Sequence, residues 1–236
     1  MIGCLYCLST GNEFKSNEHV YPESLGNKEV VLPKGIVCDK CNNEILARLD
    51  QTLIDFTPIK LRLLFLGIKN KAGNLPSARF RNVHIKRKSA QRIALDFQSK
   101  SNNDFEAYGK RFNFSVSGEV MDNKKIRLIA RALAKICLGM LHFTHGERLS
   151  FDAKYDKVRR FIIGKDSIPG YFLLNERCLL EEGGKVHTKH WLHQNCTIFL
   201  LTIYGVQFAF DLEMINRSNE YVLNRHLFNF KKYSYT

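Results

Sequence analysis

The sequence contains Cys4-Leu5-Tyr6-Cys7 and, thirty residues further on, Cys38-Asp39-Lys40-Cys41-Asn42-Asn43. Both stretches have the spacing Cys-x-x-Cys, which is typical of the short loops, or knuckles, that bind zinc in proteins. Two such pairs supply four thiolates, the ligand set of a closed tetrahedral site. We therefore expect Cys4, Cys7, Cys38 and Cys41 to bind one structural Zn²⁺ that organises the first part of the chain.

The segment between the two knuckles is longer than the roughly 15–20 residues usual in zinc-binding motifs of this kind, and it contains a second pattern. This pattern is Glu18-His19-Val20-x-Pro22-x-Ser24-Leu25-Gly26, and it is followed by Val37-Cys38-x-x-Cys41-Asn42-Asn43. The combination resembles the HNH endonucleases, and more closely their branch with four zinc-binding cysteines. The resemblance covers residues 1–55, about a quarter of the chain.

The resemblance implies a ββα-metal fold, in which a two-stranded hairpin and a helix enclose one divalent cation. It implies that His19 is the general base that activates water against a phosphodiester, and that Glu18 is a metal ligand. One of Asn42 and Asn43 would be a second ligand, with Asn43 favoured, while the other caps the helix. The chemistry agrees, because imidazole accepts protons near neutral pH and oxygen ligands suit Mg²⁺ or Mn²⁺.

The sequence departs from the family pattern at the central asparagine, whose implied role is to orient the loop that carries the histidine. That asparagine usually lies several residues before the second knuckle, where this chain has Val31-Leu32-Pro33-Lys34-Gly35. Asn27 is a displaced substitute. A second expectation concerns the strand itself: neighbouring strand residues point to opposite faces, so Glu18 and His19 share one site only if the strand end is irregular.

Turn residues and apolar spacing predict the elements of this first module. Strands are expected at 18–21 and 30–37, separated by the Gly26-Asn27 turn. A helix is expected from Asn42 or Asn43 onward, and a second helix at 59–68 after Pro58. The buried stripe of the first helix consists of Ile45, Leu46, Leu49, Leu53 and Ile54. Asp50 is then expected on the solvated face, the alternative being that it assists the chemistry.

The period of the apolar residues changes after residue 78. Alternating patterns predict strands at 79–86, 92–97 and 106–117, with basic residues on their outer faces. An amphipathic helix is expected over 124–141, with Lys135 among the basic residues outside its apolar stripe.

A hairpin of strands at 196–204 and 206–212 is expected near the end of the sequence, turning at Tyr204-Gly205. The predicted fold class is therefore α+β. It consists of a zinc-bound ββα-metal (HNH) module at residues 1–57 and a basic mixed α+β domain at residues 58–236.

Positive charge is distributed unevenly along the 236 residues. The chain has 36 Lys and Arg against 23 Asp and Glu, a net charge of +13. Residues 1–59 contain 5 basic and 8 acidic residues (−3), which leaves 31 basic and 15 acidic residues (+16) for the remainder. This asymmetry favours nucleic acid as a partner held mainly by the C-terminal three quarters. For a nuclease of this family, DNA is the expected nucleic acid. The expected phosphate contacts are Arg79, Arg81, Lys86, Arg87, Lys88 and Arg92, the alternative being a solvated sheet edge.

Three histidines, His187, His190 and His193, cluster around Trp191. A metal site needs three or four converging ligands, and the surrounding sequence does not supply an obvious full set. A solvated or nucleic-acid-facing patch is therefore favoured over a second metal site.

These observations favour a metal-dependent endonuclease, and the alternative is a catalytically inactive zinc-ribbon adaptor that binds nucleic acid or a protein. By analogy with small HNH proteins, an antiviral defence effector working beside an ATPase or a sensor is a further expectation. No stretch approaches the roughly 20 apolar residues of a membrane span, and the N-terminus lacks a signal-peptide pattern. With 7 Cys, the chain is expected to be cytoplasmic and to hold thiols or metal, without a membrane partner.

Overall fold

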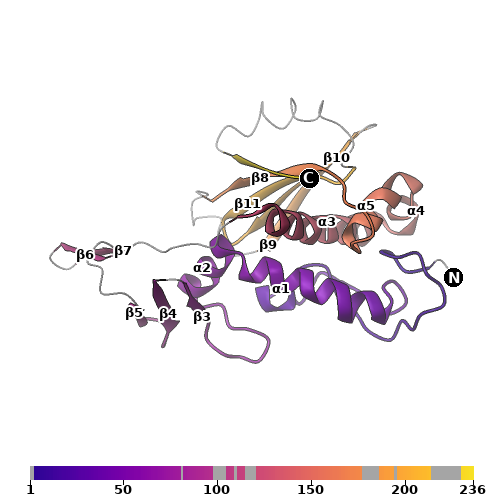
Figure 1. Ribbon diagram of the computed structural model, residues 1–236. Coiled ribbons are helices and arrows are strands. Elements are labelled where there is room, and N and C mark those ends of the chain that lie inside the picture. Colours follow the sequence, from indigo (N-terminus) through magenta and orange to yellow (C-terminus); the bar gives the residue numbers. More distant parts are fainter. Residues whose placement is uncertain are drawn as a thin grey trace.

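The long helix α3 (Asn123–His145) runs between the N-terminal elements on one side and a five-stranded sheet on the other in the computed structural model (Figure 1). The structure describes residues 3–80, 82–97, 105–108, 111–114, 121–176, 186–193, 196–213 and 230–236. The side chain of Asp122 accepts a hydrogen bond from the main-chain N–H of Lys125, which caps the start of α3. The predicted helix at 124–141 is thus confirmed and continues for one further turn.

The N-terminal elements form a short hairpin followed by a helix. Glu18 lies opposite Leu32 and His19 lies opposite Val31, so the predicted hairpin is confirmed with strands of only two residues each. Bends follow directly after His19, which confirms the expected irregular strand end. The elements are β1 (Glu18–His19), the 3-10 helix η1 (Glu23–Leu25), β2 (Val31–Leu32), the π-helical segment η2 (Cys41–Leu46) and α1 (Ala47–Asp55).

Helix α2 (Thr57–Leu66) follows α1 directly, with Pro58 in its first turn, where a missing N–H costs nothing. It ends at Gly67, whose φ of +70° is left-handed, as is usual where a helix stops. Leu64 of α2 packs against the buried face of a small sheet, together with Ala78, Val83 and Ile85. This antiparallel sheet consists of β3 (Ser77–Arg79), β4 (Val83–Arg87) and β5 (Ile93–Phe97), and a separate hairpin of β6 (Phe105–Tyr108) and β7 (Arg111–Phe114) follows.

The second half of the chain adds short helices and the five-stranded sheet. All of its strand pairs are antiparallel, in the order β12-β8-β11-β10-β9. The predicted hairpin turn is confirmed at Tyr204-Gly205, where φ is positive at both residues (48° and 81°), as tight hairpin turns of the mirror-image type require. The helices are α4 (Glu147–Ser150), the 3-10 helix η4 (Ala153–Tyr155) and α5 (Asp156–Ile162). The strands are β8 (Gly170–Asn175), β9 (Val186–His193), β10 (Cys196–Ile203), β11 (Val206–Asp211) and β12 (Lys231–Tyr235).

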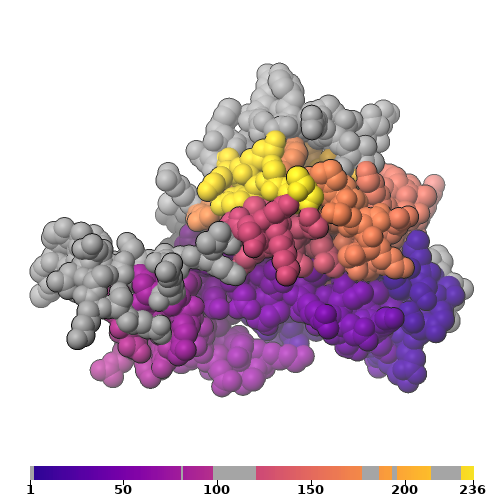
Figure 2. Space-filling view, viewed as in Figure 1, coloured from indigo at the N-terminus to yellow at the C-terminus, as the bar shows by residue number. Residues whose placement is uncertain are grey.

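One hydrophobic core connects the two halves. It contains residues of the knuckles and α1, residues of α3 and residues of the large sheet, for example Leu49, Leu133 and Phe208. In the space-filling view, the N-terminal residues (indigo and purple) form one layer, α3 lies along it, and the C-terminal strand (yellow) lies on the far side of α3 (Figure 2). The predicted α+β class is confirmed. Among the described helices, none has the length and apolar character that crossing a membrane requires.

Two predictions of solvated side chains are wrong. Lys135, expected outside the apolar stripe of α3, is completely buried, and Asp50 of α1 lies against it instead of facing solvent. The cause is tertiary packing: α3 contacts α1 and β2 as well as β12 and the later helices, so more of its surface is covered than one apolar stripe indicates.

Candidate active site

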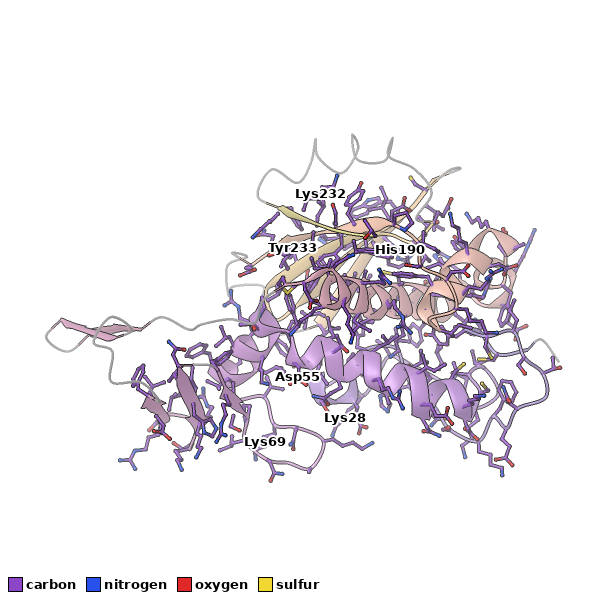
Figure 3. The ribbon with its side chains drawn as sticks, viewed as in Figure 1. Lys28, Asp55, Lys69, His190, Lys232 and Tyr233 are labelled. Atoms are coloured by element: carbon purple, nitrogen blue, oxygen red, sulfur yellow. The ribbon has the colours of Figure 1, made fainter. Side chains whose placement is uncertain are left out.

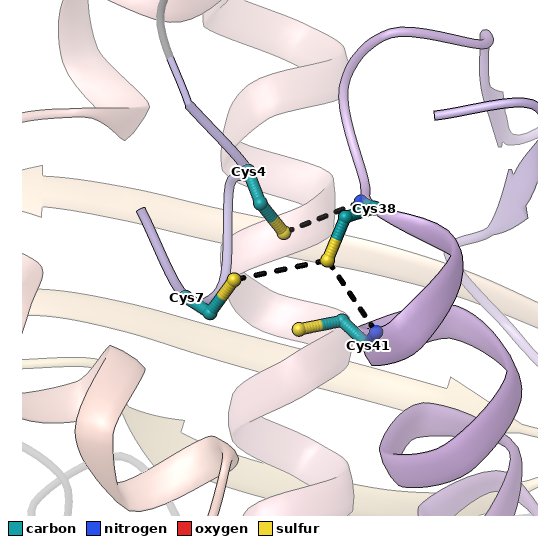
Figure 4. A group of neighbouring side chains, drawn as sticks. All are labelled: Cys4, Cys7, Cys38 and Cys41. Carbon is teal, nitrogen blue, oxygen red and sulfur yellow. Dashed lines mark hydrogen bonds between the residues drawn. The ribbon is translucent and has the colours of Figure 1, made fainter. Parts of the chain in front are cut away.

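Four cysteine side chains converge where the N-terminal loop meets the start of η2 (Figure 4). The Sγ atoms of Cys4, Cys7, Cys38 and Cys41 all lie within 4.8 Å of one another, and those of Cys7 and Cys38 are 3.7 Å apart. In a tetrahedral site with Zn–S bonds of about 2.3 Å, the sulfur atoms are roughly 3.8 Å apart. The arrangement therefore fits a structural zinc ion held by the four predicted residues.

The surroundings of the sulfur atoms also suit thiolates. The main-chain N–H of Cys38 donates to Sγ of Cys4 (3.4 Å), and that of Cys41 donates to Sγ of Cys38 (3.5 Å); dashed lines in Figure 4 mark both bonds. A hydrogen bond from Cys41 lowers the pKa of Cys4 to about 5, whereas burial raises the pKa of Cys7 to about 11. A cation would stabilise all four thiolates together, because the thiolate is the form that binds metal.

An open cleft of about 210 Å³ lies at the hairpin and reaches α1. It brings together three of the predicted site residues, Glu18, His19 and Asn42, whereas Asn43 is exposed and is not part of the lining. The Nδ2 group of Asn42 donates to the main-chain oxygen of Asn17 (2.9 Å), which fixes the amide in the π-helical segment. The lining consists of Glu18, His19, Pro22, Glu23, Ser24, Asn42, Ala47, Asp50, Gln51, Ile54 and Lys71.

His19 lies at the end of β1 with its side chain 29% exposed. Its Nε2 atom is 3.9 Å from Oε2 of Glu23, and that same oxygen is 2.6 Å from Nζ of Lys71. The hydrogen bond from Lys71 holds the pKa of Glu23 below its usual range, so this carboxylate is ionised and already has a cation beside it. Among the described residues, no group hydrogen-bonds to the buried Nδ1 atom of His19.

Glu18 lies next to His19 but faces a buried lysine. Its Oε1 atom is 2.7 Å from Nζ of Lys135, which is also 2.9 Å from Oδ1 of Asp50. Burial raises the pKa of both carboxyl groups, and the Lys135 charge opposes that rise. Burial alone would lower the pKa of Lys135, but Asp50 and Glu18 raise it above its usual range. The ammonium group of Lys135 is therefore charged, and it lies beside the two carboxyl groups at the edge of the cleft.

Asn27, the displaced substitute for the central asparagine, ties together the loop between β1 and β2. Its Nδ2 group donates to the main-chain oxygens of Tyr21 (3.3 Å) and Val30 (3.1 Å), and its Oδ1 atom accepts from the N–H of Val30 (3.1 Å). Because Tyr21 lies two residues after His19, these bonds restrain the segment that carries the histidine.

The basic residues predicted to contact phosphates lie in different environments. Arg79 and Lys86 lie on the outer face of the small sheet, with His84 of β4 paired opposite Arg79. Lys88 and Arg92 are exposed at the β4–β5 turn, and Arg81 lies outside the described residues. Arg87 is different: its guanidinium group donates to the main-chain oxygens of Leu64, Phe65, Ser89 and Ala90, so it closes the end of α2.

Lysines also border the cleft itself. Lys71 lies in the loop between α2 and β3, and Lys28 is close enough to Glu23 to lower the pKa of that carboxyl group. Lys28 and Lys69 lie on the side of α1 that faces away from the five-stranded sheet, whereas Lys232 lies on that sheet (Figure 3). The loop between α2 and β3 thus runs from the cleft to the first basic strand.

The histidines of β9 lie far along the chain from this cleft. His187, His190 and His193 belong to an extended strand, so His187 and His190 point to opposite faces; the side chain of His193 is outside the described set. His190 lies 2.8 Å (Nε2 to Nε2) from His145 at the end of α3. Among the described residues, no third His, Cys, Asp or Glu joins this pair.

Sequence reasoning missed Lys135 and misjudged Asp50 as solvated. One indication of a buried lysine was present, because Lys135 interrupts the otherwise apolar run Ala132–Met140. Lys71 was also missed, since it lies in a loop without a regular pattern.

Comparison with known proteins gives one match. Residues 4–56 match the family described as HNH endonuclease. This segment begins at the first ligand of the four-cysteine site and ends just after α1, so it contains the hairpin, the second knuckle and the helix. The chain therefore has an N-terminal HNH module of the four-cysteine branch, which supports a nuclease-type function. No curated protein and no solved structure matches the chain.

Proposed function

We propose that this protein, whose residues 4–56 are an HNH endonuclease module, is a metal-dependent endonuclease that hydrolyses phosphodiester bonds in DNA. The observation that carries the proposal is the open cleft in which His19 lies beside Glu18, Asn42 and Asp50. A base and several oxygen donors in one open cleft are the groups that phosphodiester hydrolysis requires.

His19 is the proposed general base. Its imidazole accepts a proton from a water molecule in the cleft as that water attacks the phosphorus atom. Nε2 is the proposed acceptor, because Nδ1 is buried whereas Nε2 lies 3.9 Å from Oε2 of Glu23 in the cleft lining. The neighbouring carboxylate of Glu23 would repel a phosphodiester, but its ion pair with Lys71 offsets that charge.

Glu18, Asp50 and Asn42 are the residues that would hold the divalent cation. Their carboxylate and amide oxygens are hard ligands that fit Mg²⁺ or Mn²⁺ better than a thiolate-loving metal. When bound, the cation supplies positive charge that stabilises the negative charge developing on the phosphate. Asn42 is proposed in place of Asn43, because Asn42 lines the cleft and Asn43 is exposed outside it.

The basic residues of the small sheet and of the neighbouring loop are proposed to hold the nucleic-acid backbone. Arg79, Lys86, Lys88 and Arg92 form no salt bridge with an acid of the described residues, and the loop with Lys69 and Lys71 connects them to the cleft. Contacts of this kind bind phosphates independently of base sequence. The module itself is acidic, so most of the affinity for DNA would come from this surface.

The test is a cleavage assay on plasmid, linear duplex DNA, single-stranded DNA and RNA with Mg²⁺ or Mn²⁺. The wild-type protein is expected to cut DNA. His19→Ala is expected to abolish cleavage with unchanged zinc content and melting temperature, whereas the control His145→Ala, at the far end of α3, should cleave normally. Retained cleavage by His19→Ala would overturn the assignment of the base.

Binding without cleavage, with every metal and substrate, would instead support the alternative of an inactive zinc-ribbon adaptor. The defence role, the ATPase or sensor partner and the cytoplasmic location stay predictions from the sequence.

A further inference from the structure

Lys135 lies outside the HNH module, on α3, yet its side chain ends inside the module. The Nζ atom donates to the main-chain oxygens of His19 (2.7 Å) and Val20 (3.2 Å), and it lies 2.7 Å from Oε1 of Glu18 and 2.9 Å from Oδ1 of Asp50. Four oxygen atoms from two segments of the module, residues 18–20 and α1, thus surround one ammonium group. The side chain is completely buried.

The position of α3 is itself set by close contacts with the same segments. The hydroxyl group of Tyr6, in the first knuckle, donates to the main-chain oxygen of Lys135 (3.1 Å). One turn further on, a Cβ at Gly139 would lie only 3.0 Å from Oη of Tyr6 and 3.2 Å from Cγ1 of Val20. Glycine therefore lets α3 approach the strand end that carries His19, and this approach brings Lys135 within reach.

The contacts of Lys135 act on the parts of the site that must be held still. The bonds to the main chain of His19 and Val20 fix the end of β1, at the point where regular strand geometry stops. The ammonium group also lies between the buried carboxyl group of Glu18 and the partly exposed one of Asp50, which would otherwise repel each other and the phosphodiester. Burying an ammonium group costs free energy unless its charge is paired and its N–H groups are hydrogen-bonded. The four oxygen atoms around Nζ of Lys135 meet both conditions.

We propose that Lys135 is a positioning residue of the nuclease centre, which holds the main chain of His19 and keeps Glu18 and Asp50 apart as cleft-facing groups. The inference rests on the proposed nuclease function. It extends the centre beyond the family-matched segment, because a residue of α3 then determines how His19 and the acids face the substrate.

The test compares Lys135→Met, which keeps the length and removes the charge, with Lys124→Met, an exposed control on the same helix. Zinc content and melting temperature are recorded first. The turnover number, KM for DNA and Mn²⁺ affinity by electron paramagnetic resonance are then measured below the melting temperature of both variants. The measurements are repeated on Lys135→Gln, whose amide group still donates hydrogen bonds while the charge is lost, so folding is less threatened.

Lys135→Met is expected to keep zinc and KM, to lose on the order of 100-fold in turnover because the base is misplaced, and to bind Mn²⁺ on the order of tenfold more tightly because a nearby cation is gone. Tighter Mn²⁺ binding with slower turnover separates positioning from a merely structural role, which would weaken both together. Lys124→Met should match the wild type.

Equal turnover and equal Mn²⁺ affinity in wild type and Lys135→Met would overturn the inference while leaving the nuclease proposal intact. So would weaker Mn²⁺ binding in step with turnover, in either Lys135 variant. A wild-type protein that cuts no substrate would overturn the nuclease proposal itself, and the inference with it.

Discussion

Asn27 and Val30 exchange two hydrogen bonds across the loop that joins β1 to β2. The N–H group of Val30 donates to Oδ1 of Asn27, and Nδ2 of Asn27 donates back to the main-chain oxygen of Val30, both at 3.1 Å. The second hydrogen of the same amide reaches the main-chain oxygen of Tyr21. A single side chain therefore joins the segment that follows His19 to the segment that precedes β2.

Replacing Asn27 by Ala removes these three bonds. We expect turnover to fall on the order of tenfold or more, because the loop next to the base loses its restraint, while zinc content stays unchanged. Asn123→Ala is the matched control, since Asn123 makes a similar reciprocal pair of bonds with Thr236 far from the cleft. Equal turnover in wild type and Asn27→Ala would show that the loop needs no such anchor.

The two asparagines after the second knuckle are expected to differ. Asn42→Ala should raise the Mn²⁺ concentration needed for half-maximal cleavage on the order of tenfold, within the usual effect of losing a group that orients a metal site. Asn43→Ala should have little effect, because this side chain is exposed and outside the cleft. Titration of cleavage against Mn²⁺ measures both variants. The reverse order of effects would restore Asn43 as the ligand.

Loss of the structural zinc ion should unfold the N-terminal module, so any loss of cleavage would follow from unfolding. Cys38→Ser is expected to lose zinc and to lower the melting temperature sharply, because Cys38 also accepts hydrogen bonds from Asn12 and Cys41. Cys196→Ser, at a cysteine outside the four-sulfur cluster, serves as the control and should retain zinc. Zinc is measured by atomic emission and folding by circular dichroism. Full zinc content in Cys38→Ser would contradict the four-ligand site.

The sequence predicts the first module well because its information is local. The spacing of the cysteines indicates which side chains meet at the metal, and Pro58 marks the first turn of α2, whereas the predicted end at residue 68 lies beyond Gly67, where the helix stops. The buried stripe with Leu46, Leu49 and Leu53 follows from helical periodicity alone. In each case the partners lie within one element or within a motif of known spacing.

The residues that the sequence misses have partners far away along the chain. Arg159 is buried and donates to the main-chain oxygen of Leu5 in the first knuckle (3.0 Å). Tyr204 similarly donates to the main-chain oxygen of Leu25 beside the cleft (2.5 Å). Every residue has a main-chain carbonyl oxygen, whatever its side chain. The residue types in a sequence therefore do not indicate which of these oxygens accepts a hydrogen bond from a distant arginine or tyrosine.

Arg87 is another residue, here within the basic strands, whose main-chain partners the sequence does not indicate. It follows Lys86 in β4, but its guanidinium group donates to the main-chain oxygen of Leu64 at the end of α2. The group lies so close to Gly67 that a Cβ there would be 2.7 Å from Nε of Arg87. Arg87→Ala should therefore lower the free energy of unfolding by about 1–3 kcal/mol, because carbonyl groups at the helix end lose their donor. DNA affinity and its salt dependence should stay close to wild type.

The double variant Arg79→Ala/Lys86→Ala should behave in the opposite way. Both side chains lie on the outer face of the sheet, so stability should change little, while duplex DNA binds more weakly at every sequence. Each lost phosphate contact should reduce the slope of log K against log salt by about 0.9. Fluorescence anisotropy across a salt series measures the slope, and denaturant unfolding measures stability. If the double variant unfolds early and keeps the wild-type slope, the outer face of the small sheet is a structural surface and the DNA lies elsewhere.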